Sequence, residues 1–206
     1  MKSTVVKKIV SATSAGLLLG ALMVSSASAD TVPTDVVPTV GVGSVSCRFV
    51  GQMRFSTPLV NAGIEASTTT INAKAVKCSG TGDGATVSKG RVTSVMARAT
   101  NDCAAPPSTI DATIVWKTRA GAPALADSTI ALNVRSRSVG TNGKPILDDA
   151  GTVTSGSFTG GAITTTLALT ASSTNLERAC VNGTLRHLTF SASRSRLVIS
   201  EVVVAP

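Results

Sequence analysis

The sequence predicts an all-β fold, a single antiparallel β-sandwich or β-barrel of about eight to nine strands with two disulfides. Apolar side chains recur at every second position in several segments, which is typical of strands with one buried face. Pairs of turn-forming residues separate these segments, and no long stretch shows the 3.6-residue period of a helix. Sandwich and barrel both remain open from the sequence.

The clearest alternation lies at 45–55, where Val45, Cys47, Phe49, Met53 and Phe55 share one face. The same pattern recurs at 110–116, 130–134, 163–169, 188–190 and 197–203. Each of these segments is expected to be a strand that turns one face toward the core.

Residues that tolerate a positive φ separate the strands, as turns between antiparallel strands require. They occur as the pairs Asp83-Gly84, Asn142-Gly143, Gly160-Gly161 and Asn182-Gly183. The acidic pair Asp148-Asp149 follows Lys144-Pro145 closely. We expect this acidic pair to lie in a solvated loop rather than in an active site.

The N-terminal part of the chain predicts export. Lys2, Lys7 and Lys8 precede an apolar run at 17–24, and the small-x-small motif 27–29 follows it, as in a secretory signal peptide spanning residues 1–29. Residues 30–43 then form an extended arm rich in Val and Pro, and residues 44–206 form the all-β domain. We expect a secreted, extracellular protein without a membrane span.

Charge and cysteine content fit that location. The three signal-segment lysines belong to 19 basic residues, so 16 remain against 11 acidic ones, a net charge of +5. An even number of cysteines in an exported chain favours disulfides over metal binding, since there is no Cys-x-x-Cys motif and a single histidine. We favour the pairs Cys47–Cys78, which flanks one hairpin, and Cys103–Cys180.

Candidate residues for catalysis are few. His187 is the only histidine, and no serine has the flanking glycines of a nucleophile elbow. We expect His187 to be a surface residue, and we expect no enzyme activity, no cofactor and no metal site.

Aromatic residues are scarce, with one Trp, no Tyr and four Phe. Binding of single-stranded nucleic acids depends on exposed rings, so no nucleic-acid partner is expected. Trp116 is in phase with Ile110 and Ile114, which predicts that it packs in the core.

Two pairs of arginines are spaced two residues apart, Arg135 with Arg137 and Arg194 with Arg196. If their strands were neighbours, the four guanidinium groups would form an anion-binding patch; otherwise they protect strand edges from aggregation.

The cysteine positions, the segment 55–59, the strand 109–116 and the motif Ala179-Cys180-x-x-Gly183 together resemble uncharacterised small secreted β-sheet proteins of actinobacteria. The resemblance implies export, two disulfides and an all-β domain, and it carries no functional residues.

Two functions fit these observations. The first is a non-enzymatic domain that binds a protein partner, as an adaptor in an extracellular assembly, with the arm 30–43 adding a strand to the partner. The alternative is a binder of a small ligand or of an anionic cell-envelope polymer, through a barrel interior or the arginine patch.

Overall fold

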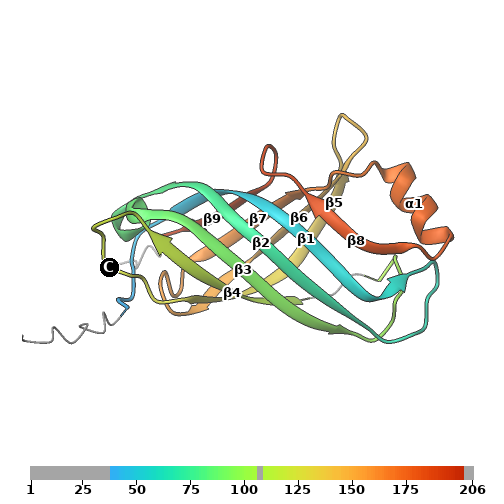
Figure 1. The fold of residues 1–206 in the computed structure, drawn as a ribbon, viewed down its shortest axis with the longest axis horizontal. Helices are drawn as coiled ribbons and strands as arrows, with labels where there is room; N and C mark the ends of the chain where they lie inside the picture. Colours follow the sequence, from blue (N-terminus) through green and yellow to red (C-terminus); the bar gives the residue numbers. More distant parts are fainter. Residues whose placement is uncertain (1–37, 106–108, 202–206) are drawn as a thin grey trace, which may run out of the picture. The chain divides into compact units, whose positions relative to one another are not determined.

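The computed structural model describes residues 38–105 and 109–201 (Figure 1). The predicted signal peptide, residues 30–37 of the predicted arm and Val203 lie outside the described residues. Within them the chain forms nine strands, one 3-10 helix η1 (Gly82–Thr86) and one α-helix, α1 (Ser173–Val181). The strands are β1 (Val45–Leu59), β2 (Ser67–Gly80), β3 (Val87–Arg98), β4 (Thr109–Thr118), β5 (Ser128–Val139), β6 (Pro145–Ser155), β7 (Ala162–Ala168), β8 (Leu185–Phe190) and β9 (Arg196–Ser200).

The sheet closes on itself, so the fold is a barrel rather than a sandwich. Its strand order is β2-β3-β4-β5-β6-β7-β9-β1-β8, and β1 also pairs with β2 to complete the ring. Every strand pair is antiparallel. The all-β prediction and the number of strands are confirmed.

Strand β1 has two partners along the edge that faces away from β2. Its first residues, Val45–Arg48, pair with β9, whereas residues from Gly51 onward pair with β8. The barrel wall therefore has eight strands, and β8 extends it beside the second half of β1.

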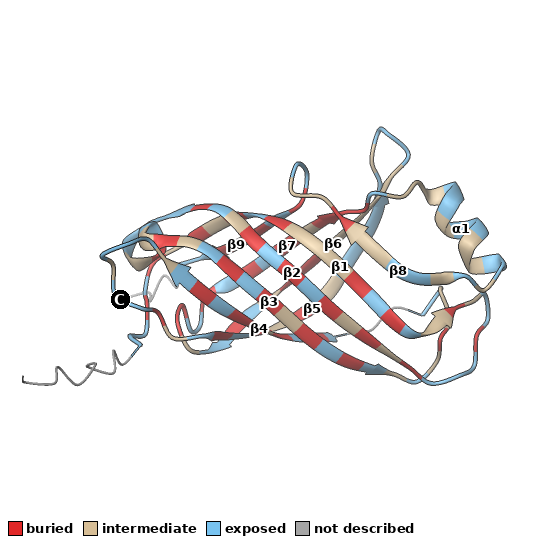
Figure 2. Ribbon diagram, viewed as in Figure 1, coloured by how far each residue is buried: buried red, intermediate tan, exposed pale blue. Residues whose placement is uncertain are grey.

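The predicted alternation is confirmed in β1, where the side chains of Val45, Cys47, Phe49, Met53 and Phe55 are buried. Figure 2 shows the same succession of buried and exposed residues along β2, β3 and β4. Because neighbouring strands are in register, the buried positions meet in the barrel interior and form the core. Trp116, with 7% of its surface exposed, belongs to this core as predicted.

The two disulfides confirm the predicted pairing. Cys47–Cys78 joins β1 to β2, and Cys103–Cys180 joins the segment before β4 to α1. Helix α1 was not predicted from the sequence. It begins after Ser172, whose hydroxyl accepts a hydrogen bond from the Asn175 backbone N–H, as an N-cap residue does.

Candidate functional site: a cavity at one end of the barrel

One end of the barrel is closed by packed side chains. The Trp116 ring packs edge-on against Phe158 at 5.6 Å between centroids, and Trp116 Nε1 donates to the Ser128 hydroxyl at 2.7 Å. The last residues of the arm also lie here, since Thr39 pairs with Leu125 and the Gly41 N–H donates to the Ser157 hydroxyl. This arrangement packs the interior at the closed end.

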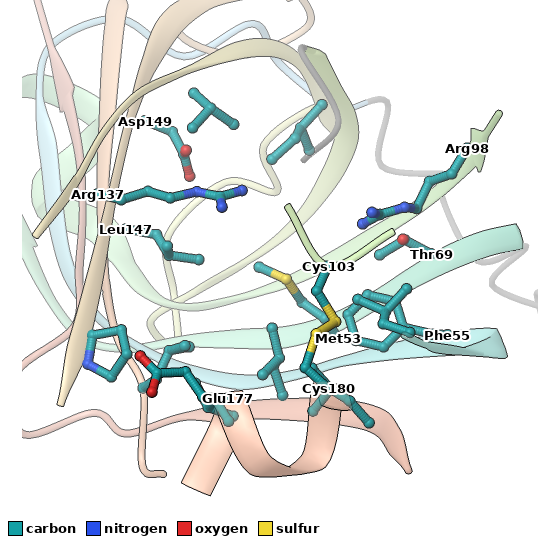
Figure 3. A pocket seen from close by; sticks show the side chains of 18 of the residues that line it. Met53, Phe55, Thr69, Arg98, Cys103, Arg137, Leu147, Asp149, Glu177 and Cys180 are labelled. Carbon is teal, nitrogen blue, oxygen red and sulfur yellow. A yellow bond between two sulfur atoms is a disulfide. The ribbon is translucent and has the colours of Figure 1, made fainter. Parts of the chain in front are cut away.

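The other end contains a cavity of about 360 Å³ (Figure 3). Its wall is mostly apolar and comes from β1 to β6, β8 and α1. The apolar lining includes Met53, Phe55, Leu59, Met96, Ile110, Val134, Val139, Pro145, Leu147, Leu169, Leu176, Leu185 and Leu188.

The cavity exists because the strands differ in length. β1 has 15 residues and β2 has 14, whereas β7 has 7, so the wall between β6 and β8 stops short. After the single bridge between Leu169 and Phe190 the chain leaves the sheet and forms α1. Leu176, Glu177 and Cys180 of α1 line the cavity where the strand is missing.

A β-bulge in β5 brings an arginine into the cavity. Val134 lies opposite Asp149 of β6, but the register shifts at Arg135, so that Arg137 lies opposite Leu147. An inserted residue reverses the alternation of the residues that follow it. Val134, Arg137 and Val139 consequently line the same cavity, although an uninterrupted strand would place Val134 and Arg137 on opposite faces.

Asp149 is a buried carboxyl group in the wall of the cavity, with 4% of its surface exposed. Burial raises the pKa of Asp149, because the charged form loses its hydration, and the negative charge of Asp148 acts in the same direction. A hydrogen bond from the Thr165 hydroxyl, at 3.0 Å, and the positive charge of Arg137 act in the opposite direction. The expectation that Asp148 and Asp149 lie in a solvated loop is wrong, since both belong to β6.

A second arginine, Arg98, enters the cavity from the side opposite Arg137 (Figure 3). Burial lowers the pKa of Arg98, and the charge of Arg137 lowers it further. Its guanidinium donates to the backbone carbonyls of Thr100, Asp102 and Ala105, and it lies 5.8 Å from the centre of the Phe55 ring. Arg98 therefore also holds the loop that carries Cys103.

Thr69 contributes an unpaired polar atom to the wall. Its hydroxyl is buried and is the only such side-chain oxygen or nitrogen without a hydrogen-bond partner among the described residues. A buried hydroxyl without a partner is costly, so a ligand atom that accepts or donates here would be favoured.

The four arginines of the predicted patch do not lie together. β5, with Arg135 and Arg137, is separated from β9 by β6 and β7, so the strands are not neighbours. Arg137 lines the cavity, while Arg135 is exposed and lies at the register shift. Arg194 borders a smaller depression with Lys144, and Arg196 lies on the outer surface opposite Arg48. The sequence reasoning missed Arg98 and Thr69, which carry no motif.

His187 is exposed on β8 opposite Arg54 and does not line the cavity. Over the described ranges, no three His, Cys, Asp or Glu side chains gather as a metal site would need. In the same part of the chain, no helix has the length and apolar character needed to cross a membrane.

No protein-family model, curated protein or solved structure matches the chain.

Proposed function

We propose that the protein is a secreted, non-enzymatic binding protein that holds a small, largely apolar molecule in the end cavity. The cavity itself is the observation that carries this proposal. Its volume of about 360 Å³ lies within the range of about 300–1,000 Å³ of small-molecule sites. A cavity of about 150 Å³ accommodates benzene, so a ligand of about twice that size fits here.

The chemistry of the wall supports the same conclusion. Mostly apolar linings with a few polar groups are typical of ligand sites, because apolar burial supplies the affinity and the polar groups set the orientation. Here the polar groups that a ligand would meet are those of Thr69, Arg98, Arg137, Ser138, Asp149 and Glu177. Eight-stranded barrels are just wide enough to hold one small ligand, which suits the position of the cavity inside the wall.

The two disulfides are compatible with the oxidising environment outside a cell and support the proposal of secretion.

The geometry of the N-terminal arm favours the adaptor role less than it favours ligand binding. Part of the arm is already occupied, since Thr39 and Gly41 form backbone hydrogen bonds with Ala124 and Phe158. These groups are not available to add a strand to a partner, and the adaptor role stays a prediction that depends on residues 30–37.

Binding of the neutral fluorophore N-phenylnaphthylamine tests the proposal, because its emission rises in apolar surroundings. Val134 lines the cavity, whereas Val95 lies on the outer surface of β3 with 72% of its surface exposed. We expect Val134→Trp to fill the cavity and weaken binding at least about tenfold, and Val95→Trp to leave it unchanged. Decanol should displace the fluorophore from the wild-type protein.

Thermal unfolding of each variant checks the fold. If Val134→Trp does not fold, Val139→Trp at the cavity rim replaces it, since Val139 is 63% exposed and a larger side chain is easily accommodated. Absence of binding to the wild-type protein, or equal binding by the folded cavity variant and Val95→Trp, would overturn the proposal.

A further inference from the structure

The outer surface of the barrel has a cluster of basic side chains that is separate from the cavity. We call it the basic face; all its members are exposed, and they come from five consecutive strands of the ring, β9, β1, β2, β3 and β4. The basic face consists of Arg48, Lys74, Lys89, Arg91, Lys117 and Arg196. None of these residues lines the cavity.

Strand register places these cations directly beside one another. Arg196 of β9 lies opposite Arg48 of β1, and Lys89 of β3 lies opposite Lys117 of β4. Lys74 of β2 lies opposite Arg91 of β3. Side chains at opposite positions are about 5 Å apart at their Cβ atoms, and five neighbouring strands cover about 19 Å. The basic face is thus a continuous band across the strands β1 to β3, which run side by side in Figure 1.

Acidic residues are absent from β1, β2, β3 and β9, all of which lie within the described part of the chain. The one acidic residue of β4, Asp111, lies six positions before Lys117, which is about 20 Å along the strand. Like charges at opposite positions destabilise a sheet. The arrangement therefore costs stability, and β1, β2, β3 and β9 carry no carboxylate that offsets it.

Two ordinary explanations do not account for the basic face. Basic residues on strands often protect exposed edges from pairing with other chains, but β1, β2, β3 and β4 each have a partner on both sides. Solubility is better served by charges of both signs mixed on the surface. A concentration of one sign on one face is typical of a surface that attracts an oppositely charged partner.

We propose that the basic face binds a linear, flexible polyanion, such as a phosphate- or uronic-acid-bearing polymer of a cell envelope. Successive acid groups of one polymer can contact Arg196, Arg48, Lys89 and Lys117 in turn as the polymer crosses the strands. Val76 of β2 lies between Arg48 and Lys89, and no aromatic residue occupies a position in this row of paired residues. Because bases have nothing to stack on here, the face fits a polymer recognised by charge rather than a single-stranded nucleic acid.

Titration with long-chain inorganic polyphosphate at several salt concentrations tests this inference. Each phosphate that a basic side chain neutralises contributes about 0.7 to the magnitude of the slope of log affinity against log salt for a single-stranded polyanion. The triple variant Arg48→Gln, Lys89→Gln, Arg91→Gln should reduce the magnitude of that slope by about 2. The matched control Arg135→Gln, Lys144→Gln, Arg178→Gln removes the same charges away from the basic face and should leave the slope near its wild-type value.

Polygalacturonate in a parallel titration distinguishes carboxylate from phosphate polymers; tighter binding of either one supports the inference and identifies the acid group. Equal losses in the triple variant and the control would show an effect of net charge alone and would overturn it. Tighter binding of duplex DNA than of polyphosphate, at equal phosphate and salt concentrations, would also overturn it. The cavity proposal is tested with a neutral fluorophore, so the two can fail independently.

Discussion

Asp148 and Asp149 are adjacent in the chain, yet they have opposite surroundings. Strand geometry directs consecutive side chains to opposite faces. Asp148 lies on the outer side, where it accepts hydrogen bonds from Ser136 and Thr166, and Asp149 lies in the interior with Thr165. The buried member of the pair is the one that gives the cavity a titrating group.

The pKa of Asp149 predicts how stability depends on pH. Because folding raises this pKa, the folded protein binds more protons than the unfolded chain between 3.8 and the raised value, and its stability falls as pH rises through that window. Asp149→Asn keeps an oxygen for the Thr165 hydroxyl and removes the charge. We expect the variant to be more stable than wild type at neutral pH, and the difference to shrink as pH falls toward 3.8. Urea unfolding at a series of pH values measures this, and a difference that is independent of pH would contradict it.

Helix α1 is the least anchored element of the described barrel. None of its residues is fully buried, and it meets the rest of the molecule through Leu176, the Cys103–Cys180 disulfide and the hydrogen bonds that Ser173 donates to the Gly143 carbonyl. Elements with few buried contacts open at low free-energy cost. The disulfide therefore sets how firmly α1 closes the side of the cavity.

Replacing both Cys103 and Cys180 by Ser should lower the free energy of unfolding by about 4 kcal/mol, because the bond closes a loop of 77 residues. Amide hydrogen exchange should accelerate in α1 and stay slow in β1 to β4. The single change Ser172→Ala, which removes the helix N-cap and leaves the disulfide intact, should cost only about 1 kcal/mol. Unchanged exchange in α1 of the double variant would show that the helix is held by other contacts.

The whole barrel has two ends with different construction. At the closed end Ser157 is fully buried, and its hydroxyl accepts from the Gly41 N–H at 3.1 Å and donates to the Thr39 carbonyl at 3.3 Å. These bonds hold the end of the arm against the ring, whereas the cavity lies on the side of α1. The proposed ligand cavity and the attachment point of the arm thus lie at opposite ends of the barrel.

This separation predicts the outcome of Ser157→Ala. The variant leaves the buried Gly41 N–H without an acceptor, which should cost about 1–3 kcal/mol of unfolding free energy. Exchange of the Gly41 amide should accelerate, while N-phenylnaphthylamine should bind the cavity with wild-type affinity. A comparable loss of fluorophore binding would mean that the two ends are coupled.

Much of the fold could be predicted from the sequence because the alternation of inward apolar and outward polar side chains is a property of each strand by itself. The strand at 45–55 and the burial of Trp116 follow from side chains within one segment. The alternation of β2 is weaker, because its inward positions hold small residues such as Thr69, Ala73 and Ala75. Helix α1 was missed because nine residues with one partly buried leucine show too little periodicity.

The all-β class, the inward faces of the main strands and the two disulfides could be predicted from the sequence, since they depend on residue type and on spacing along the chain. The choice between sandwich and barrel, the positions of Arg98 and Arg137 on opposite sides of one cavity and the basic face became visible only in the folded structure. The physical reason is that a site depends on which strands are neighbours and on their register. Ring closure pairs β1 with β9, so Arg48 and Arg196 meet although most of the chain lies between them.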